Sequence, residues 1–226
     1  MTTNPKTAIL IFANSSAREA HIKPFVNAEA VFSTLNSEII SKVKKTNLPY
    51  FIVDEHEQIG RTFGERFANA IQGIYNKGYD TVISVGNDTP QLKTSQILKA
   101  NTQISEDNFV LGPSQNGGFY LLALHQSNFD FETFIKLPWQ TSKIRKRFVS
   151  SFKTDKKQIL LKSLKDLNTA LDLSYFLTCF GSLSKQLQLA ILQSLNNIRI
   201  YITDVICNTT QFIPDFGFNK GSPTLA

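Results

Sequence analysis

Short apolar runs that end in polar turns constrain the fold of this chain more than any other feature. Residues 81–85 (TVISV) and 108–111 (NFVL) are such runs, and a third, at 119–124, follows a Gly-Gly pair directly. Uninterrupted apolar runs of this length are typical of strands buried on both faces of a sheet. The segment therefore predicts an open α/β sheet whose strands end in ligand-facing turns.

Extended and helical patterns alternate through the first part of the chain. Further strands are predicted at 7–13 and 48–53, and apolar residues at helical spacing predict helices at 25–45, 63–76 and 94–101. Residues 14–23 are expected to form a loop. Because strands separated by helices wind into a parallel sheet, we expect one α/β domain with a mostly parallel, twisted sheet and one antiparallel strand.

The pattern changes after Phe131. We expect a basic helix at 141–152, a short strand at 158–161, a helix at 169–180 and another helix between 183 and 195. Residues 198–206 fit either a strand or a helix, and 212–226, with two prolines and two glycines, are expected to form a mobile tail. The α/β domain is thus predicted to span 1–180, with 181–226 as a helical appendage and tail rather than an independent domain.

Composition excludes several classes of protein. Apolar residues make up 42% of the chain and include 18 Phe, which suits a packed core and not a disordered chain. No run approaches the roughly 20 apolar residues of a membrane span, and the first residues do not resemble a signal peptide. Cys179 and Cys207 lack metal-ligand spacing, so we expect reduced thiols, a cytoplasmic location and no membrane partner.

The net charge of +6 is unevenly placed. Ten Lys and Arg residues lie between 136 and 165, against one acidic residue, Asp155. This stretch fits either a solvated helix face or a surface that attracts phosphates. It lacks the interleaved aromatic residues of a stacking platform, so nucleic acid is not the expected partner. Ile144, Phe148 and Phe152 form one helical stripe that is predicted to face the core.

A carboxylate marks the end of the strand at 81–85. Asp88 follows the strand directly, where open α/β sheets place their ligands, and it is suited to hold Mg²⁺ or Mn²⁺ against phosphates. Asn87 is placed to add an amide oxygen. A turn role, in which either side chain accepts backbone hydrogen bonds, is the alternative for both residues.

Several segments together resemble a known family. They are residues 60–66 (GRTFGER), 85–90 (VGNDTP), 111–120 (LGPSQNGGFY), 137–141 (LPWQT) and 166–169 (DLNT), in this order. The combination resembles an uncharacterised bacterial family of glycosyltransferase-A-like proteins in the nucleotide-diphospho-sugar transferase superfamily. Its relatives include 2-phospho-lactate guanylyltransferase and molybdenum-cofactor guanylyltransferase. The resemblance implies a three-layer sandwich with a mostly parallel twisted sheet, followed here by the helical appendage.

The resemblance also implies an activity and a set of site residues. It implies a transferase that takes a nucleotide or nucleotide-sugar donor and a small-molecule acceptor, with Mg²⁺ or Mn²⁺ bound at Asp88. Asp88 and Asn116 are the implied catalytic residues. The implied substrate-binding residues are Arg18, Lys23, Arg66, Asn87, Gly117, Gly118 and Trp139. Their alternatives are surface charges for the cations, turns for the Asn and Gly residues, and core packing for Trp139.

Two departures from the family pattern leave a second function open. The loop expected at 14–23 contains no glycine, and its cations are Arg18 and Lys23. Asn116 stands where the pattern has an Asp that would be a second metal ligand, and an amide oxygen binds such ions more weakly than a carboxylate. The predicted function is therefore a glycosyltransferase or nucleotidyltransferase, or a catalytically degenerate ligand-binding protein on the same fold.

Overall fold

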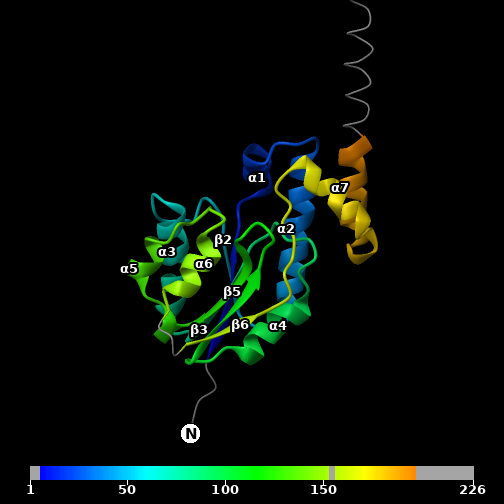
Figure 1. Cartoon of the computed structure of the whole chain (residues 1–226). Coiled ribbons are helices and arrows are strands. Elements are labelled where there is room, and N and C mark those ends of the chain that lie inside the picture. Colours follow the sequence, from blue (N-terminus) through cyan, green and yellow to red (C-terminus); the bar gives the residue numbers. More distant parts are fainter. Residues whose placement is uncertain (1–5, 153–155, 197–226) are drawn as a thin grey trace, which may run out of the picture.

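The protein is built around a six-stranded mixed sheet (Figure 1). The structure, a computed structural model, describes residues 6–152 and 156–196. The strands lie in the order β2-β1-β3-β5-β4-β6. Their bounds are β1 Thr7–Phe12, β2 Tyr50–Val53, β3 Thr81–Val85, β4 Asn108–Pro113, β5 Phe119–His125 and β6 Lys157–Leu160.

Strand directions agree with the predicted sheet. β1 pairs in parallel with β2 and β3, and β4 pairs in parallel with β6, whereas β5 is antiparallel to both of its neighbours. β1 and β3 are the central parallel pair, with Leu10 opposite Ser84. The prediction of a mostly parallel sheet with one antiparallel strand is therefore confirmed.

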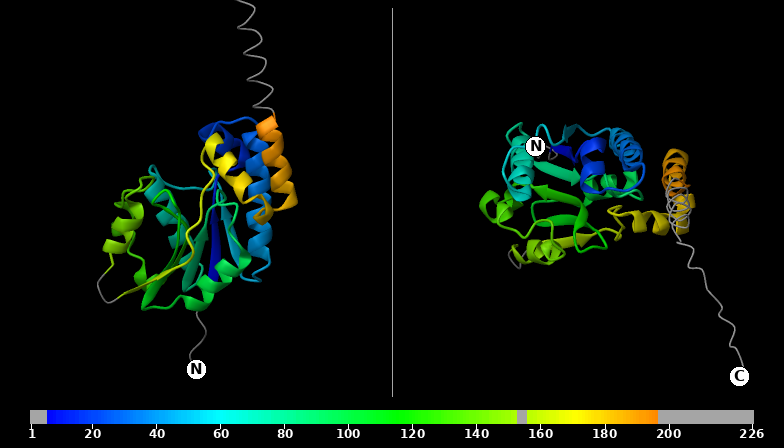
Figure 2. Two further views of the ribbon diagram at one scale, coloured as in Figure 1. Left: turned by 45° about the vertical axis from the view of Figure 1, so that its right-hand side comes forward. Right: turned by 90° about the horizontal axis from the view of Figure 1, so that it is seen from above.

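Helices cover both faces of this sheet and complete a three-layer sandwich (Figures 1 and 2). Helices α2 (Ala28–Lys44) and α4 (Thr94–Gln103) share a buried apolar cluster with one face, which includes Ile9 and Ile83. Helices α3 (Phe63–Tyr75), α5 (Phe131–Ile135) and α6 (Ile144–Ser150) share the cluster of the other face. Alternate side chains of the buried strands thus point to opposite faces of the sheet and pack into two separate cores.

The C-terminal helices pack against α2 and not against the sheet (Figure 2). Helix α7 (Ala170–Thr178) begins with a capping box between Thr169 and Asp172, and residues 185–196 are also helical. Phe176 and Ile191 from these helices join Phe32 of α2 in a third buried cluster. Two short 3₁₀ helices, Gln126–Asn128 and Phe180–Ser182, connect neighbouring elements.

The expectation of a loop at 14–23 is wrong, because Ser16–Ile22 form helix α1. Ser15 caps this helix by accepting a hydrogen bond from the backbone N–H of Arg18. Ser15 is held in turn by Glu55, whose carboxylate accepts bonds from the Ser15 hydroxyl and, at 2.6 Å, from its backbone N–H. The local cap from Ser15 is thus reinforced by a contact with a residue far away in the chain.

The basic segment behaves largely as predicted. Helix α6 is shorter than expected, and α5 precedes it where no helix was expected. Ile144 and Phe148 are buried, and Phe152 stacks on Phe109 with ring centroids 4.1 Å apart. The stripe is therefore core, and Lys143, Lys146 and Arg147 are exposed on the other side of the segment.

Other sequence predictions fall outside the described part of the chain. These concern the segment at 198–206, the tail at 212–226 and Cys207. Cys179 is half-buried as a free thiol. Among the described residues, no helix combines the length and apolar character that a membrane crossing requires.

Candidate functional site

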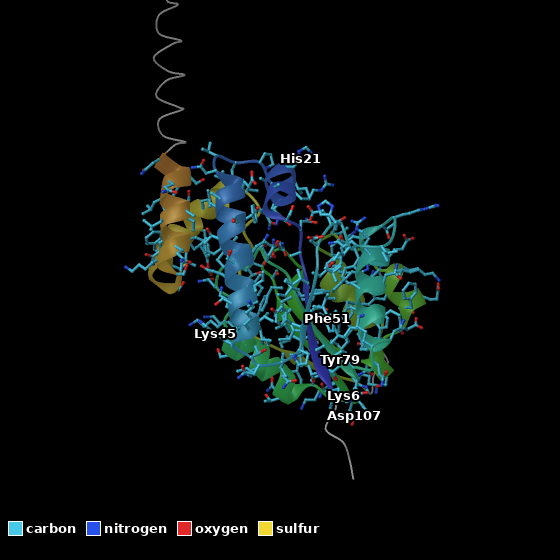
Figure 3. The ribbon with its side chains drawn as sticks, turned by 180° about the vertical axis from the view of Figure 1, so that it is seen from behind. Lys6, His21, Lys45, Phe51, Tyr79 and Asp107 are labelled. Atoms are coloured by element: carbon cyan, nitrogen blue, oxygen red, sulfur yellow. The ribbon has the colours of Figure 1, made fainter. Side chains whose placement is uncertain are left out.

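The carboxyl ends of the parallel strands open into one cleft of about 1050 Å³. Segments that follow β1, β2, β3 and β4 line it, together with helix α1 and the start of β5. Figure 3 shows His21 of α1 at this end of the sheet, with Lys6 and Asp107 at the opposite end. The topology of an open α/β sheet therefore places the cleft where such sheets bind ligands.

Asp88 and Lys23 form the charged centre of the cleft. The Lys23 ammonium lies 2.9 Å from Asp88 Oδ2 and 3.2 Å from Glu19 Oε2. Burial lowers the pKa of Lys23, but the charges of Asp88 and Glu19 and their hydrogen bonds outweigh burial, so its net pKa is raised. Lys23 therefore stays an ammonium ion between two carboxylates.

A second carboxylate, Asp166, lies beside Asp88. Its Oδ1 accepts a hydrogen bond of 2.7 Å from the Thr89 hydroxyl, and its Oδ2 accepts one of 3.1 Å from the Asn116 amide. Burial, and next the negative charge of Asp88, raise the pKa of Asp166 to about 6. The backbone N–H of Leu167 also donates to the Asp88 carbonyl at 2.7 Å, which ties the two segments together.

Asn87 braces the loops rather than projecting freely into the cleft. Its side-chain amide donates to Asn36 Oδ1 at 2.7 Å and to the carbonyl of Asn14 at 3.4 Å. The Asn14 amide donates to Glu19 Oε1 at 2.8 Å. This chain of amides joins the end of β3 to α2 and to α1, and so holds Asp88 and Lys23 on a fixed frame.

The other predicted cations differ in how firmly they are held. Arg18 lines the cleft and is exposed. Arg66 lines it as well, but its guanidinium donates to Gln58 Oε1 and to the carbonyl of Arg61, both at 3.2 Å. It therefore anchors the loop before α3, while Glu65 completes the capping box with Thr62 that begins this helix.

The two glycines after Asn116 differ. Gly118 lines the cleft, whereas Gly117 is not among the lining residues. Gly117 has a φ of +93°, and a Cβ there would lie 2.3 Å from the Ser142 carbonyl oxygen. Its lack of a side chain lets the turn pack against the segment before α6, which is a structural requirement.

Trp139 lines the cleft from within an aromatic cluster. Its indole N–H donates to the Phe134 carbonyl at 2.7 Å, and its ring contacts Phe63, Phe67 and Phe119. Much of the Trp139 side chain is therefore packed, and only part of it is available to a ligand.

The buried hydroxyl of Ser84 also faces this side of the cleft, and it has no hydrogen-bond partner among the described residues.

The residues around Asp88 fit a divalent ion that a substrate completes. Within residues 6–152 and 156–196, no group of three His, Cys, Asp or Glu side chains is arranged to hold a metal by itself. Asp88 and Asp166 nevertheless provide two carboxylates whose mutual repulsion a cation would relieve. Mg²⁺ is commonly held by one or two carboxylates, with waters and substrate phosphates as the other ligands.

Sequence reasoning brought most of the site together but missed three acidic residues. Except for Gly117, every predicted site residue lines the cleft. The sequence marks Asp166 only as part of the segment 166–169 and predicts no role for it. Glu19 and Glu55 also line the cleft. The i,i+4 spacing of Glu19 and Lys23 is a sequence signal for their ion pair once the segment is helical, whereas the partner of Glu55, Ser15, is known only from the folded structure.

The chain was compared with solved structures and with curated proteins, and one solved structure shares its fold. A structure from Desulfovibrio desulfuricans G20, described as a presumed nucleotide-diphospho-sugar transferase, is 19% identical, with a TM-score of 0.72 over 87% of this chain and 98% of that one. A homologue of Mycobacterium tuberculosis rv0371c from Mycobacterium sp. strain JC1 is 12% identical, with a TM-score of 0.45 over 77% of this chain and 96% of that one. No curated protein matches the chain.

The sequence comparison agrees with the resemblance inferred from the motifs. Residues 44–141 match a family described as "Uncharacterized protein conserved in bacteria (DUF2064)". This range includes β3, β4 and β5 and the turns that carry Asp88 and Asn116. In residues 44–141 the chain thus carries the pattern of this uncharacterised bacterial family, on a fold similar to that of the presumed nucleotide-diphospho-sugar transferase from Desulfovibrio desulfuricans G20.

Proposed function

We propose that the protein is a transferase that binds a nucleotide or nucleotide-sugar donor and moves a nucleotidyl or glycosyl group to a small acceptor. The observation that carries this proposal is the pair Asp88 and Asp166, held with Lys23 at the carboxyl edge of the sheet in a cleft of about 1050 Å³. A strongly perturbed carboxyl in a cleft is a physical sign of a functional site. The fold likeness supports the same class of protein.

Each residue of the charged centre has a role in this proposal. Asp88 and Asp166 would hold Mg²⁺ or Mn²⁺, and the bound ion would supply positive charge against the departing phosphate. Lys23 and Arg18 bind the donor's phosphates, because both are cations that line the cleft. Asn116 orients Asp166 through its amide. These groups act by positioning and by electrostatic stabilisation.

The acceptor is proposed to bind on the aromatic side of the cleft. Phe119 and Trp139 line that side and belong to the same packed cluster. Gly118, which precedes Phe119 in the chain and follows Asn116 by two residues, lines the cleft as well. The cytoplasmic location expected from the sequence stays a prediction.

Thermal melting with combined ligands tests this function. The protein is melted with each common nucleoside diphosphate at millimolar concentration, with and without Mn²⁺. We expect stabilisation that requires both the nucleotide and the metal, and its loss in Asp88→Asn and Asp166→Asn. Asp107→Asn is the control, since this exposed side chain lies at the opposite end of the sheet (Figure 3). Equal stabilisation of all four proteins would contradict the proposal.

A catalytically degenerate binding protein is the second candidate. It is favoured by Asn116, whose amide oxygen and nitrogen are both engaged, with the Gly118 N–H and with Asp166. The position where the family pattern has an Asp therefore adds no carboxylate to Asp88 and Asp166. Nucleotide stabilisation that is independent of Mn²⁺ would favour this candidate over the transferase.

A further inference from the structure

Lys23 lies where a metal ion would neutralise Asp88. Its ammonium contacts one oxygen of Asp88 at 2.9 Å and one oxygen of Glu19 at 3.2 Å. The Lys23 and Glu19 side chains are only 15% and 7% exposed, and all three residues line the cleft. A positive charge is therefore already built into the position that a divalent ion is proposed to take.

The surroundings of Glu19 make this ammonium difficult to remove without a replacement. Glu19 Oε1 accepts a hydrogen bond from Asn14, and the buried Oε2 has the Lys23 ammonium, at 3.2 Å, as its one charged partner among the described residues. A buried carboxylate without a counter-ion is costly. Lys23 leaves readily only if another cation arrives.

The Lys23 ammonium is also placed so that it can move from Asp88 to a ligand in the cleft. Lys23 is the C-cap residue of α1, its side chain lines the cleft, and its ammonium lies 5.2 Å from the centre of the buried Phe32 ring. A flexible four-carbon stem lets an ammonium move between neighbouring anions. A phosphate bound in the cleft would offer such an anion.

We propose that Lys23 occupies the cation position of Asp88 in the metal-free protein and competes with the divalent ion for that carboxylate. This inference rests on the metal site of the proposed function. When a donor's phosphates enter, they offer the ammonium a new partner, and Asp88 becomes free for the ion. Metal and donor then bind with positive coupling, and the metal alone binds weakly.

Direct measurement of Mn²⁺ binding tests the competition. Free Mn²⁺ is followed by electron paramagnetic resonance as the metal alone is added to the wild type and to Lys23→Met. We expect Lys23→Met to bind Mn²⁺ about tenfold more tightly or better, a change equivalent to ~1.4 kcal/mol or more. The gain should vanish in the double variant Lys23→Met/Asp88→Asn, because Asp88 is the carboxylate that is released.

Lys42→Met is the matched control. Lys42 also forms an i,i+4 ion pair, at 3.0 Å from Glu38, but it does not line the cleft. Lys42→Met removes the same charge from the protein as Lys23→Met. Because salt screens distant charges, its Mn²⁺ affinity should stay within about twofold of the wild type. If Lys23→Met does not fold, as judged by circular dichroism, Lys23→Gln takes its place.

The outcomes separate this inference from the proposed function. Unchanged Mn²⁺ affinity in Lys23→Met, with weaker affinity in Asp88→Asn, would overturn the competition and leave the metal site standing. Absence of Mn²⁺ binding at Asp88 in every protein, Lys23→Met included, would overturn both. An equal gain in Lys23→Met and Lys42→Met would reduce the effect to net charge and would also overturn the inference.

Discussion

The side-chain amide of Asn116 donates a hydrogen bond of 3.1 Å to Asp166 Oδ2. Its carbonyl oxygen accepts a hydrogen bond of 3.0 Å from the backbone N–H of Gly118, so the orientation of the amide is determined by both atoms. Asn116 thus supplies a neutral donor to a carboxylate that already lies near Asp88. Its contribution to the site is to hold Asp166 without adding charge.

Asn116→Asp should therefore destabilise the metal-free protein at neutral pH. The substitution replaces a donor by a carboxylate beside Asp166 and adds repulsion in a partly buried site. Mn²⁺ should restore the lost melting temperature, since hard divalent ions favour additional carboxylates. Asn116→Ser is the control: it removes the amide but adds no charge, so Mn²⁺ should not rescue it preferentially. A melting temperature in Asn116→Asp that does not respond to Mn²⁺ would contradict a metal site here.

Asp166→Asn should gain stability relative to the wild type as pH rises through about 6. Because its pKa is about 6 in the folded protein and about 3.9 for an ordinary Asp, the folded state binds more protons between these pH values. The free energy of unfolding therefore falls as pH rises from about 4 to above 6. An Asn cannot lose a proton, so this loss is absent in the variant, and its carbonyl oxygen can still accept the bond from Thr89.

Urea unfolding at several pH values measures this effect. The stability of Asp166→Asn relative to the wild type should grow as pH rises from 4 to 7 and then level off. Asp107→Asn, at the far end of the sheet, should show no such trend. A constant difference between Asp166→Asn and the wild type across the range would indicate that Asp166 ionises in the folded protein as it does in the unfolded chain.

The fold was predictable because each strand of the sheet is visible in the local sequence as a short apolar run. The run at 81–85 and the run at 119–124 became β3 and β5 almost residue for residue, since strands buried on both faces are uniformly apolar. Helix α1 was missed although Ser15 directly before it is a local N-cap residue, because a short polar segment after a strand fits a loop equally well. The bonds from Ser15 to Glu55 that fix this cap are known only from the folded structure.

Site residues that follow a predicted strand could be predicted from the sequence, whereas those placed by long-range strand pairing could not. Asp88 and Asn116 each come three residues after the end of a strand, β3 and β4, so the topology of the sheet places both at its ligand-binding edge. Asp166 comes instead after an irregular segment that follows β6. Its position depends on the parallel pairing of β6 with β4, and on the bond from Leu167 to Asp88. Such long-range contacts leave no periodic signal in the sequence.

Phe148→Ala should cost about 3 kcal/mol or more, as expected for a buried Phe. Phe148 is 1% exposed and packs edge-on against Phe109 and Phe134 at centroid distances of 5.6 and 6.2 Å. Lys146→Ala, two residues earlier on the exposed side of α6, should change stability by less than about 0.5 kcal/mol. Denaturant unfolding that ranks the two variants the other way would show that α6 does not pack through this stripe.

Gly64→Ala should displace Trp139 and destabilise the protein. A Cβ at Gly64 would lie 2.6 Å from Trp139 Cδ1 and 2.8 Å from the Ile135 carbonyl oxygen, and one of these neighbours is backbone. Overpacking of this kind costs about 1–3 kcal/mol. Trp139 should lose its hydrogen bond to the Phe134 carbonyl as its ring moves. Since the chain has one Trp, its fluorescence emission reports this movement directly, as a shift to longer wavelength.

Gly73→Ala in the same helix provides the matched control. No atom outside the local backbone lies within 4 Å of the Cβ position at Gly73, so the methyl group meets open space. An Ala inside a helix is favoured over a Gly by about 1 kcal/mol, and Gly73→Ala should therefore be slightly stabilising. Its emission spectrum should match the wild type. Equal melting temperatures and identical spectra for both variants would show that Trp139 is not wedged against α3, and would leave its ring free for a ligand in the cleft.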